Sequence, residues 1–257
     1  MGDLQAKILD ELAGFRGRIG LAIEIGEECI YYNHQEVFPS ASVIKVPILI
    51  AGLKQAEEGL VNLNQITRIT NRVGGSGVLQ SLSSLASLTV KDLMTLMITV
   101  SDNIATNMVI DLLGMKKINQ VIDGLGMSST KLNRKMMDFA AIEAGLDNVT
   151  TPSDIIRCLK VMDEASFISA ESSERALTIM GAQQFQDKLP AMMDPERMYI
   201  GNKTGGLPGV EHDCAILKYN GKTAYIAALT EKLEDVYSAR YLFARIGKHI
   251  YDYLLDE

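Results

Sequence analysis

The 257-residue sequence contains few cysteines and lacks any long apolar run. The three cysteines, Cys29, Cys158 and Cys214, have no paired or metal-like spacing, which argues against a disulfide scaffold or a zinc site. We expect them to be buried small hydrophobic side chains in a reducing compartment. No apolar run approaches the roughly 18 residues that a membrane-spanning helix needs, so a spanning segment is not expected.

The sequence also lacks a basic stripe, because 25 Lys and Arg residues are outnumbered by 32 Asp and Glu residues. This balance excludes a protein that tracks nucleic-acid phosphates and favours a small molecule or peptide as the partner. The N-terminus has no basic flank followed by an apolar stretch, and residues 3–15 instead predict an amphipathic helix. The chain as given is therefore expected to be cytoplasmic, or secreted if a signal peptide has been removed.

Strand-like segments occur near both ends of the chain, and helical segments fill the middle. The predicted strands cover residues 18–25, 28–32, 198–203, 214–219 and 223–230. The main predicted helices cover residues 3–15, 45–58, 88–99, 104–113 and 234–255. An Asn220-Gly221 pair between the last two strands is typical of a tight hairpin turn.

This order predicts an α+β fold with one five-stranded antiparallel sheet, flanked by terminal helices, and an inserted all-helical lobe. We expect residues 1–38 and 181–257 to form the sheet lobe and residues 39–180 to form the helical lobe. A ligand site is expected in the cleft between the two lobes.

Two segments match the pattern Ser-x-x-Lys, which average residue frequencies predict about once in a chain of this length. Ser42 opens a strongly apolar helix, so its hydroxyl would lie at the positive end of that helix. Lys45 falls on the same helix face and should reach the Ser42 oxygen. Ser128, by contrast, leads into a polar stretch, and we expect no catalytic role for it.

Two rarer tripeptides follow the first motif in the sequence. Residues 101–103, Ser-Asp-Asn, join two predicted helices, where they either project into a cleft or simply cap the second helix. Residues 203–205, Lys-Thr-Gly, end a predicted strand and precede Gly206. Backbone N–H groups there would be free to face a ligand, although an ordinary strand exit is the alternative.

In this order, the three motifs are the signature of class A β-lactamases and penicillin-binding proteins. The chain resembles that family over nearly its whole length. The resemblance rests on residues 38–39, 74–77, 99–107 and 203–205. It implies the β-lactamase/transpeptidase-like fold and a serine hydrolase that forms an acyl-enzyme on a β-lactam or a peptidoglycan-like peptide, without metal or cofactor.

The resemblance also implies roles for individual residues. Ser42 would attack the amide or lactam carbonyl, and Lys45 would accept its proton, with a pKa lowered by burial and by the charge of Lys203. Ser101 would relay a proton to the leaving nitrogen.

The remaining implied roles concern substrate binding. Asn103 would hydrogen-bond the substrate amide, and Lys203 and Thr204 would hold a substrate carboxylate. The backbone N–H groups of Ser42 and Gly206 would form the oxyanion hole.

The sequence departs from the family pattern where a glutamate should activate the deacylating water. The family pattern is Arg-x-Glu-x-x-Leu-Asn, and alignment on Arg134 places Met136 at the glutamate and Ala140 at the asparagine. Neither side chain can accept a proton from water. Asp138 and Glu143 are the nearest carboxylates, but their offsets are wrong, so deacylation is expected to be slow.

A second departure concerns the arginine that often grips the substrate carboxylate in this family. His212 occupies a nearby position here, and a histidine is mostly neutral at pH 7. It would either contact the substrate or make a structural hydrogen bond with Asp213 or Glu211.

Three functions therefore stay open. The first is a class A-type β-lactamase with slow deacylation. The second is a penicillin-binding D-alanyl-D-alanine carboxypeptidase or related amidase. The third is a non-catalytic sensor that binds a β-lactam or a peptide.

Overall fold

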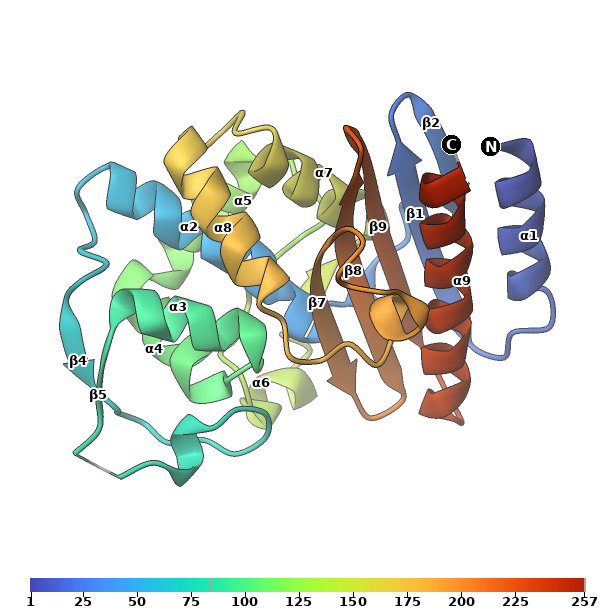
Figure 1. The fold of residues 1–257 in the computed structure, drawn as a ribbon. Helices are drawn as coiled ribbons and strands as arrows, with labels where there is room; N and C mark the ends of the chain where they lie inside the picture. The colour runs from blue at the N-terminus through green and yellow to red at the C-terminus, as the bar shows by residue number, and fades with distance from the viewer. Residues whose placement is uncertain (84, 257) are drawn as a thin grey trace.

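The computed structural model describes residues 1–83 and 85–256, and its centre is a five-stranded antiparallel sheet in the order β2-β1-β9-β8-β7 (Figure 1). The strands are β1 (Arg18–Ile25), β2 (Glu28–Tyr32), β7 (Tyr199–Leu207), β8 (Val210–Tyr219) and β9 (Lys222–Glu231). Both ends of the chain contribute to this sheet, which confirms the predicted α+β fold. The Asn220-Gly221 turn joins β8 to β9 with positive φ angles of 46° and 79°.

Helices lie on both sides of the sheet (Figure 1). The two terminal helices, α1 (Gly2–Leu12) and α9 (Val236–Asp256), pack against each other on the outer face. The helices from the middle of the chain lie on the inner side of the sheet, and the last two of them contact its strands. In chain order, the middle helices are α2 (Lys45–Glu57), α3 (Val90–Thr99), α4 (Asn103–Leu113), α5 (Met115–Gly124), α6 (Phe139–Glu143), α7 (Pro152–Asp163) and α8 (Ala170–Gly181).

Shorter elements connect these parts. Two small antiparallel pairs are β3 (Phe38–Pro39) with β6 (Val149–Thr150), and β4 (Ile66–Arg68) with β5 (Ser87–Thr89). Three 3-10 turns are η1 (Ala41–Ile44), η2 (Leu79–Ser81) and η3 (Leu189–Met192). The turn η1 leads directly into α2, and η3 packs on α9.

The sheet separates two hydrophobic cores. Alternate residues of β8 point to opposite faces, as strand geometry requires: Cys214 and Ile216 join the core under the helices, whereas Ala215 and Leu217 join the core under α1 and α9. A strand that is buried on both faces is held firmly. The sheet can therefore support a site at its β7 edge.

The strands β7 and β8 are longer than the sequence predicts. The Lys-Thr-Gly motif lies inside β7, not at its end, and β8 begins at Val210 instead of Cys214. The added part of β8 contains Glu211, His212 and Asp213, all at most 4% exposed. Hydrophobic periodicity misses this segment because its polar side chains are buried with polar partners.

Cys29 corrects the expectation that all three cysteines are buried. Cys158 and Cys214 are buried, but Cys29 is exposed. Its strand, β2, is an edge strand in which only Ile30 is buried, so the neighbouring side chains face solvent.

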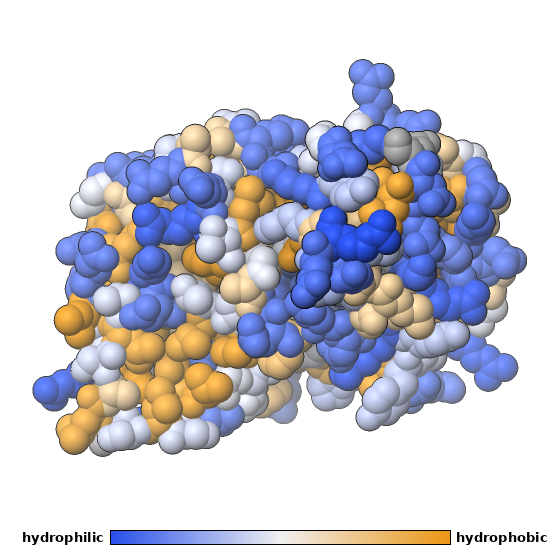
Figure 2. Space-filling view, in the orientation of Figure 1, coloured by the Kyte–Doolittle hydropathy of each residue, from blue (hydrophilic) through white to orange (hydrophobic). Residues whose placement is uncertain are grey.

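The surface is uneven in polarity. Figure 2 shows apolar side chains gathered over the β4–β5 end of the molecule, where Ile66, Leu82 and Leu85 are exposed, and a more polar surface over the sheet. Within residues 1–83 and 85–256, no helix combines the length and apolar character that a membrane span requires.

Candidate active site

A cavity of about 280 Å³ brings the three sequence motifs together. Ser42 and Ser101 line it from the helical side, and Thr204, Gly205 and Gly206 line it from β7. The cavity therefore lies where the edge of the sheet meets the start of α2 and the α3–α4 junction. The Ser-x-x-Lys copy at residues 128–131 is elsewhere, with both Ser128 and Lys131 exposed.

The turn η1, which leads directly into α2, presents Ser42 to this cavity. Residues 46–53 of the helix are all buried, so it runs through the core and holds its N-terminal end rigidly. Ala41, the residue before the serine, has a φ of 43°, a conformation that L-residues rarely adopt. A Cβ atom on Gly205 would lie 3.2 Å from both the Ala41 Cβ and the Ser42 nitrogen, so glycine lets β7 approach the nucleophile closely.

Lys45 is fully buried. Its Nζ donates to the Ser101 carbonyl at 2.8 Å, to Ser101 Oγ at 3.0 Å and to Asn103 Oδ1 at 3.0 Å. These described contacts go to the second motif and not to Ser42, which differs from the predicted direct contact. Burial, together with the charge of Lys203, holds the pKa of Lys45 well below its usual value. The amine is therefore suited to accept a proton.

Ser101 is the point where the three motifs meet. Its φ of 52° is left-handed, and this conformation directs both its carbonyl and its hydroxyl to Lys45. From the other side, Lys203 Nζ donates to Ser101 Oγ at 3.1 Å. One hydroxyl thus lies between two amines, an arrangement that allows a proton to pass through it.

Lys203 is also fully buried, in β7. Its Nζ donates to the Thr204 carbonyl at 2.6 Å as well as to Ser101. Burial lowers the pKa of Lys203 to about 7. Its charge is therefore sensitive to pH near neutrality, and an anionic ligand would favour the protonated form.

Asp102 fixes the geometry of the second motif. Its Oδ1 accepts from Ala105 N at 2.9 Å, which caps α4, and its Oδ2 accepts from Val78 N at 2.7 Å and Leu79 N at 2.8 Å. Gly77 is required here, because a Cβ atom would lie 2.2 Å from Asp102 Oδ2. The motif is therefore a helix cap and also an anchor for the loop that carries Ser76 into the cavity.

Asn103 is 7% exposed and already has partners at both ends of its amide. Oδ1 accepts from Lys45, and Nδ2 donates to the Gly74 carbonyl at 3.2 Å. In this arrangement the residue orients Lys45. Its predicted contact with a substrate amide requires Nδ2 to exchange Gly74 for the ligand.

His212 does not reach the cavity, which corrects the prediction that it contacts the substrate. The ring is fully buried, with Nε2 2.6 Å from the Pro39 carbonyl and Nδ1 2.6 Å from the Glu211 carbonyl, and the Thr230 N–H donates to Nδ1 at 3.1 Å. Burial lowers the pKa of His212 to about 4, so the ring is neutral at pH 7. His212 therefore makes the structural hydrogen bond with Glu211 that was the alternative prediction.

The loop that carries Met136 is firmly held although it lacks the family's glutamate. Asn107 in α4 accepts from Met136 N at 2.7 Å and donates to the Met136 carbonyl at 3.1 Å. Arg134 Nε donates to Asp147 Oδ1 at 2.8 Å and closes the loop. Asn107 is one helical turn after Asn103, so the clamp brings Met136 close to the Lys45 site, with a side chain that is 7% exposed and packs into the core.

The two nearby carboxylates do not replace the missing base. Asp138 is exposed and caps α6 by accepting from Ala141 N at 3.1 Å. Glu143 is exposed at the other end of the same short helix, and Ala140 lies between them. Of the described residues, the carboxylates that line the cavity are Asp187 and Glu211 instead.

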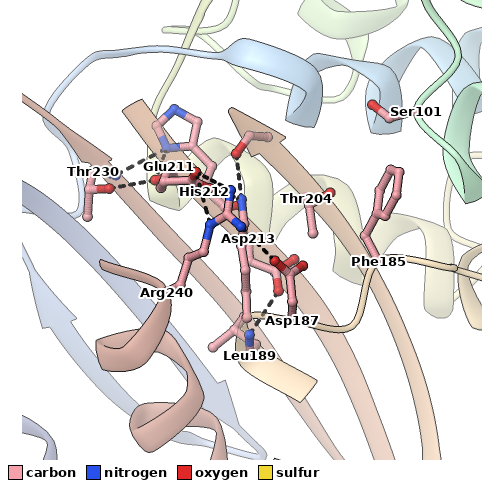
Figure 3. A network of polar contacts seen from close by, with 12 residues as sticks. Ser101, Phe185, Asp187, Leu189, Thr204, Glu211, His212, Asp213, Thr230 and Arg240 are labelled. Carbon is pink, nitrogen blue, oxygen red and sulfur yellow. Dashed lines mark hydrogen bonds and ion pairs between the residues drawn. The ribbon is translucent and has the colours of Figure 1, made fainter. Parts of the chain in front are cut away.

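A charge network that lines the cavity and is centred on the buried Glu211 was not predicted (Figure 3). Glu211 is 4% exposed and pairs with Lys188 on one oxygen, while its Oε1 accepts from Arg240 Nη2 at 2.8 Å and Nε at 3.2 Å. Arg240 Nη1 also donates to Asp187 at 3.0 Å. No sequence spacing links these residues, because they come from the segment before η3, from β8 and from α9.

One aromatic ring also faces the cavity. Phe185 lines it and is 39% exposed, and Figure 3 shows the ring beside Thr204 on the side that faces Ser101. This ring gives an otherwise polar cavity an apolar wall.

Comparison with known proteins agrees with the geometry of the site. The model of a family described as the beta-lactamase enzyme family matches residues 3–254. A beta-lactamase from Bacteroides uniformis is 26% identical, over 98% of this chain and 91% of its own length.

Two solved structures are similar over the whole chain. A beta-lactamase from Sphaerobacter thermophilus superposes with a TM-score of 0.90 at 29% identity, covering 100% of this chain and 98% of its own. PBP-A has a TM-score of 0.90 at 26% identity, covering 100% of this chain and 97% of its own. The chain therefore belongs to the beta-lactamase enzyme family, as a class A-like serine hydrolase.

Proposed function

We propose that this enzyme acylates Ser42 efficiently with β-lactam or D-alanyl-D-alanine-like amides and releases the acyl group slowly. The observation that carries the proposal is the contrast between the complete Lys45–Ser101–Lys203 relay and the apolar Met136 in the clamped loop. The first supports bond formation to the serine. The second removes the usual activation of the water that breaks this bond.

In the acylation step, Ser42 Oγ forms a bond to the substrate carbonyl carbon and loses its proton to Lys45, whose Nζ must first become neutral and exchange one of its contacts with Ser101 or Asn103 for Ser42. The carbon–nitrogen bond of the substrate then breaks. Ser101 donates its proton to the leaving nitrogen and recovers one from the Lys45 ammonium, 3.0 Å away. The lowered pKa of Lys45 supports this cycle, because the amine must be neutral at the start.

Substrate binding uses the β7 side of the cavity. A substrate carboxylate would meet Thr204 and the positive charge of Lys203, and the N–H groups of Ser42 and Gly206 would bind the carbonyl oxygen that becomes negative. Asn103 would hydrogen-bond the substrate amide after releasing Gly74. In this reading, residues 39–180 supply the nucleophile, and the sheet lobe of residues 1–38 and 181–257 supplies the anion site.

Slow release is also supported by the ion pairs of the two carboxylates that line the cavity. Both Asp187 and Glu211 are paired with Arg240, and Glu211 is also paired with Lys188, so neither is a free base. Hydrolysis of the acyl-enzyme would have to rely on Lys45 or on unassisted water. Each is a weaker arrangement than a carboxylate aimed at the water.

A D-alanyl-D-alanine carboxypeptidase or amidase is the second candidate. A mutant of PBP-A with one leucine replaced by glutamate was solved as an acyl-enzyme complex with penicillin G; it is 26% identical to this chain, with a TM-score of 0.89, and this similarity favours a protein that binds penicillin covalently. An imipenem-hydrolyzing beta-lactamase of Enterobacter cloacae, 26% identical over 79% of this chain and 72% of its own length, favours the β-lactamase alternative.

The test is to incubate the protein with a penicillin, a chromogenic cephalosporin and a D-alanyl-D-alanine peptide. Intact mass, colour change and free D-alanine are followed together. An adduct that accumulates on Ser42 with little turnover is the expected result. Fast turnover of either β-lactam contradicts slow release, and the absence of both adduct and turnover with all three substrates leaves the binding sensor.

A further inference from the structure

Lys188 is a buried lysine that lines the cavity and makes two hydrogen bonds and one ion pair. Its Nζ donates to the Gly205 carbonyl at 2.7 Å and to the His212 carbonyl at 2.9 Å, and it pairs with the Glu211 carboxylate. The residue is 3% exposed. A buried ammonium thus lies on a carbonyl of the Lys-Thr-Gly strand, close to the nucleophile.

The Gly205 carbonyl and the Gly206 N–H belong to the same peptide group. In a trans peptide these two bonds point in opposite directions. Glu211 of β8 lies opposite Thr230 of β9 on one side and opposite Gly206 of β7 on the other. Its carbonyl faces β9, where it accepts from Thr230 Oγ1 at 2.6 Å. In an antiparallel sheet, the N–H and carbonyl of the opposite Gly206 then face away from β8. Because β7 is the edge strand, the Gly206 N–H points out of the sheet toward the cavity.

We propose that Lys188 is a positioning residue for the oxyanion hole. Its ammonium binds the carbonyl end of the Gly205–Gly206 peptide, orients that peptide and polarises it, so that the Gly206 N–H becomes a stronger donor to the developing oxyanion. Hydrogen bonds in series strengthen one another, and a buried charge acts more strongly than one in water. This inference rests on the proposed acylation of Ser42.

The surrounding charges leave part of the positive charge of Lys188 available to polarise the Gly205 carbonyl. Glu211 alone would neutralise Lys188, but Arg240 binds the same carboxylate through two nitrogens, at 2.8 Å and 3.2 Å. Two cations therefore share one buried anion. Asp187, the other partner of Arg240, is 53% exposed and screened by solvent.

The position of Lys188 is also fixed through the backbone. The Leu189 N–H donates to Asp213 Oδ2 at 3.0 Å, and Asn202 Nδ2 donates to Asp213 Oδ1 at 3.2 Å. Both partners lie in the sheet, so the start of η3 is tied to β7 and β8. The ammonium is therefore held on the Gly205 carbonyl before any substrate arrives.

The test measures acylation by benzylpenicillin and the infrared carbonyl stretch of the resulting acyl-enzyme, using penicillin labelled with carbon-13 at the lactam carbonyl. In Lys188→Met we expect an acylation rate constant about tenfold lower, a smaller change in the binding constant and a carbonyl stretch at higher frequency. Lys160→Met serves as the matched control, since it removes a lysine that pairs with Glu24 far from the cavity. It should leave both readouts unchanged.

A double variant, Lys188→Met with Glu211→Gln, separates polarisation from simple ion pairing. In this variant Glu211 no longer carries a buried charge without its lysine partner. If the Lys188–Glu211 pair only stabilised the structure, the variant would recover the wild-type acylation rate and carbonyl frequency, and that recovery would overturn the proposal. We expect both readouts to stay shifted. If the wild-type protein forms no adduct, the proposed function itself fails; a normal wild-type adduct with unchanged variants rejects the role of Lys188 alone.

Discussion

The acylation relay and the loop around Met136 differ in chemistry, although hydrogen bonds hold both in place. In the acylation relay, Lys45, Ser101 and Lys203 form a continuous chain of contacts at 3.0 and 3.1 Å. The Met136 loop is held by two hydrogen bonds with Asn107, and the Met136 side chain is apolar and packs into the core.

This difference shows that the scaffold and the chemistry of a catalytic loop are separable. The Asn107 clamp contacts only backbone atoms of Met136, and the Arg134–Asp147 pair lies outside the catalytic position. Neither interaction depends on the side chain at residue 136. The loop can therefore keep its shape while the capacity to activate water is absent.

The largest expected effect comes from removing the nucleophile. Ser42→Ala should abolish the covalent adduct with penicillin, because among the described residues Ser42 is the hydroxyl that η1 presents to the cavity. Intact mass spectrometry measures this directly. Ser128→Ala, in the exposed Ser-x-x-Lys copy, is the matched control and should acylate normally; an adduct that survives in Ser42→Ala would refute the site.

The next effect concerns the proposed proton acceptor of the acylation relay. Lys45→Met should lower the acylation rate by about 10³-fold, since it removes the amine and its contacts with Ser101. Stopped-flow mixing with a chromogenic cephalosporin gives the rate. Lys54→Met, further along the same helix and partly exposed, is the control. A loss of less than tenfold in Lys45→Met would mean that another group accepts the proton.

The third prediction restores a carboxylate in the Met136 loop and tests the role of this loop in release. Met136→Glu should raise deacylation by about 10- to 100-fold and leave acylation nearly unchanged, because the backbone clamp already positions residue 136. The decay of the adduct mass after removal of free penicillin measures it. Met136→Gln has the same length without the base and should not accelerate release. Equal adduct lifetimes in the two variants would show that the loop does not aim this side chain at the water.

The smallest effect is a pH dependence on the β7 side. The pKa of Lys203 is about 7, so its charge is present below that pH and is lost as the pH rises through it. Binding of a carboxylate-bearing substrate should weaken about fivefold between pH 6 and 9, the equivalent of roughly 1 kcal/mol. Concentration dependence of acylation at each pH measures this. An ester-capped substrate without the carboxylate should lack the trend, and a shared trend would assign it to another group.

Much of this site could be predicted from the sequence. Ser42, Lys45, Ser101 and Lys203 belong to short motifs whose order and context are specific, and the structure brings them together. The departure at Met136 was also visible, because Arg134 anchors the alignment of the loop. Short sequence motifs are enough to predict a site when its reactive side chains come from a few contiguous segments.

The charge network could not be predicted. Lys188, Glu211 and Arg240 are distant in sequence and meet only because the sheet, η3 and α9 pack together. The sequence also left two roles open for His212, substrate contact or a structural hydrogen bond, and the structure turns its ring toward Pro39 and Thr230. Which way a side chain points from a strand depends on the register, and register is set by the whole sheet.

The central claim is that acylation is fast and release is slow, and a single adduct time course tests it most directly. The protein is mixed with a modest excess of benzylpenicillin, the adduct on Ser42 is followed by intact mass, and free penicillin is then removed. We predict that the protein becomes stoichiometrically acylated and that the adduct persists long after acylation is complete. Continuous penicillin hydrolysis without accumulation of an adduct would contradict the account.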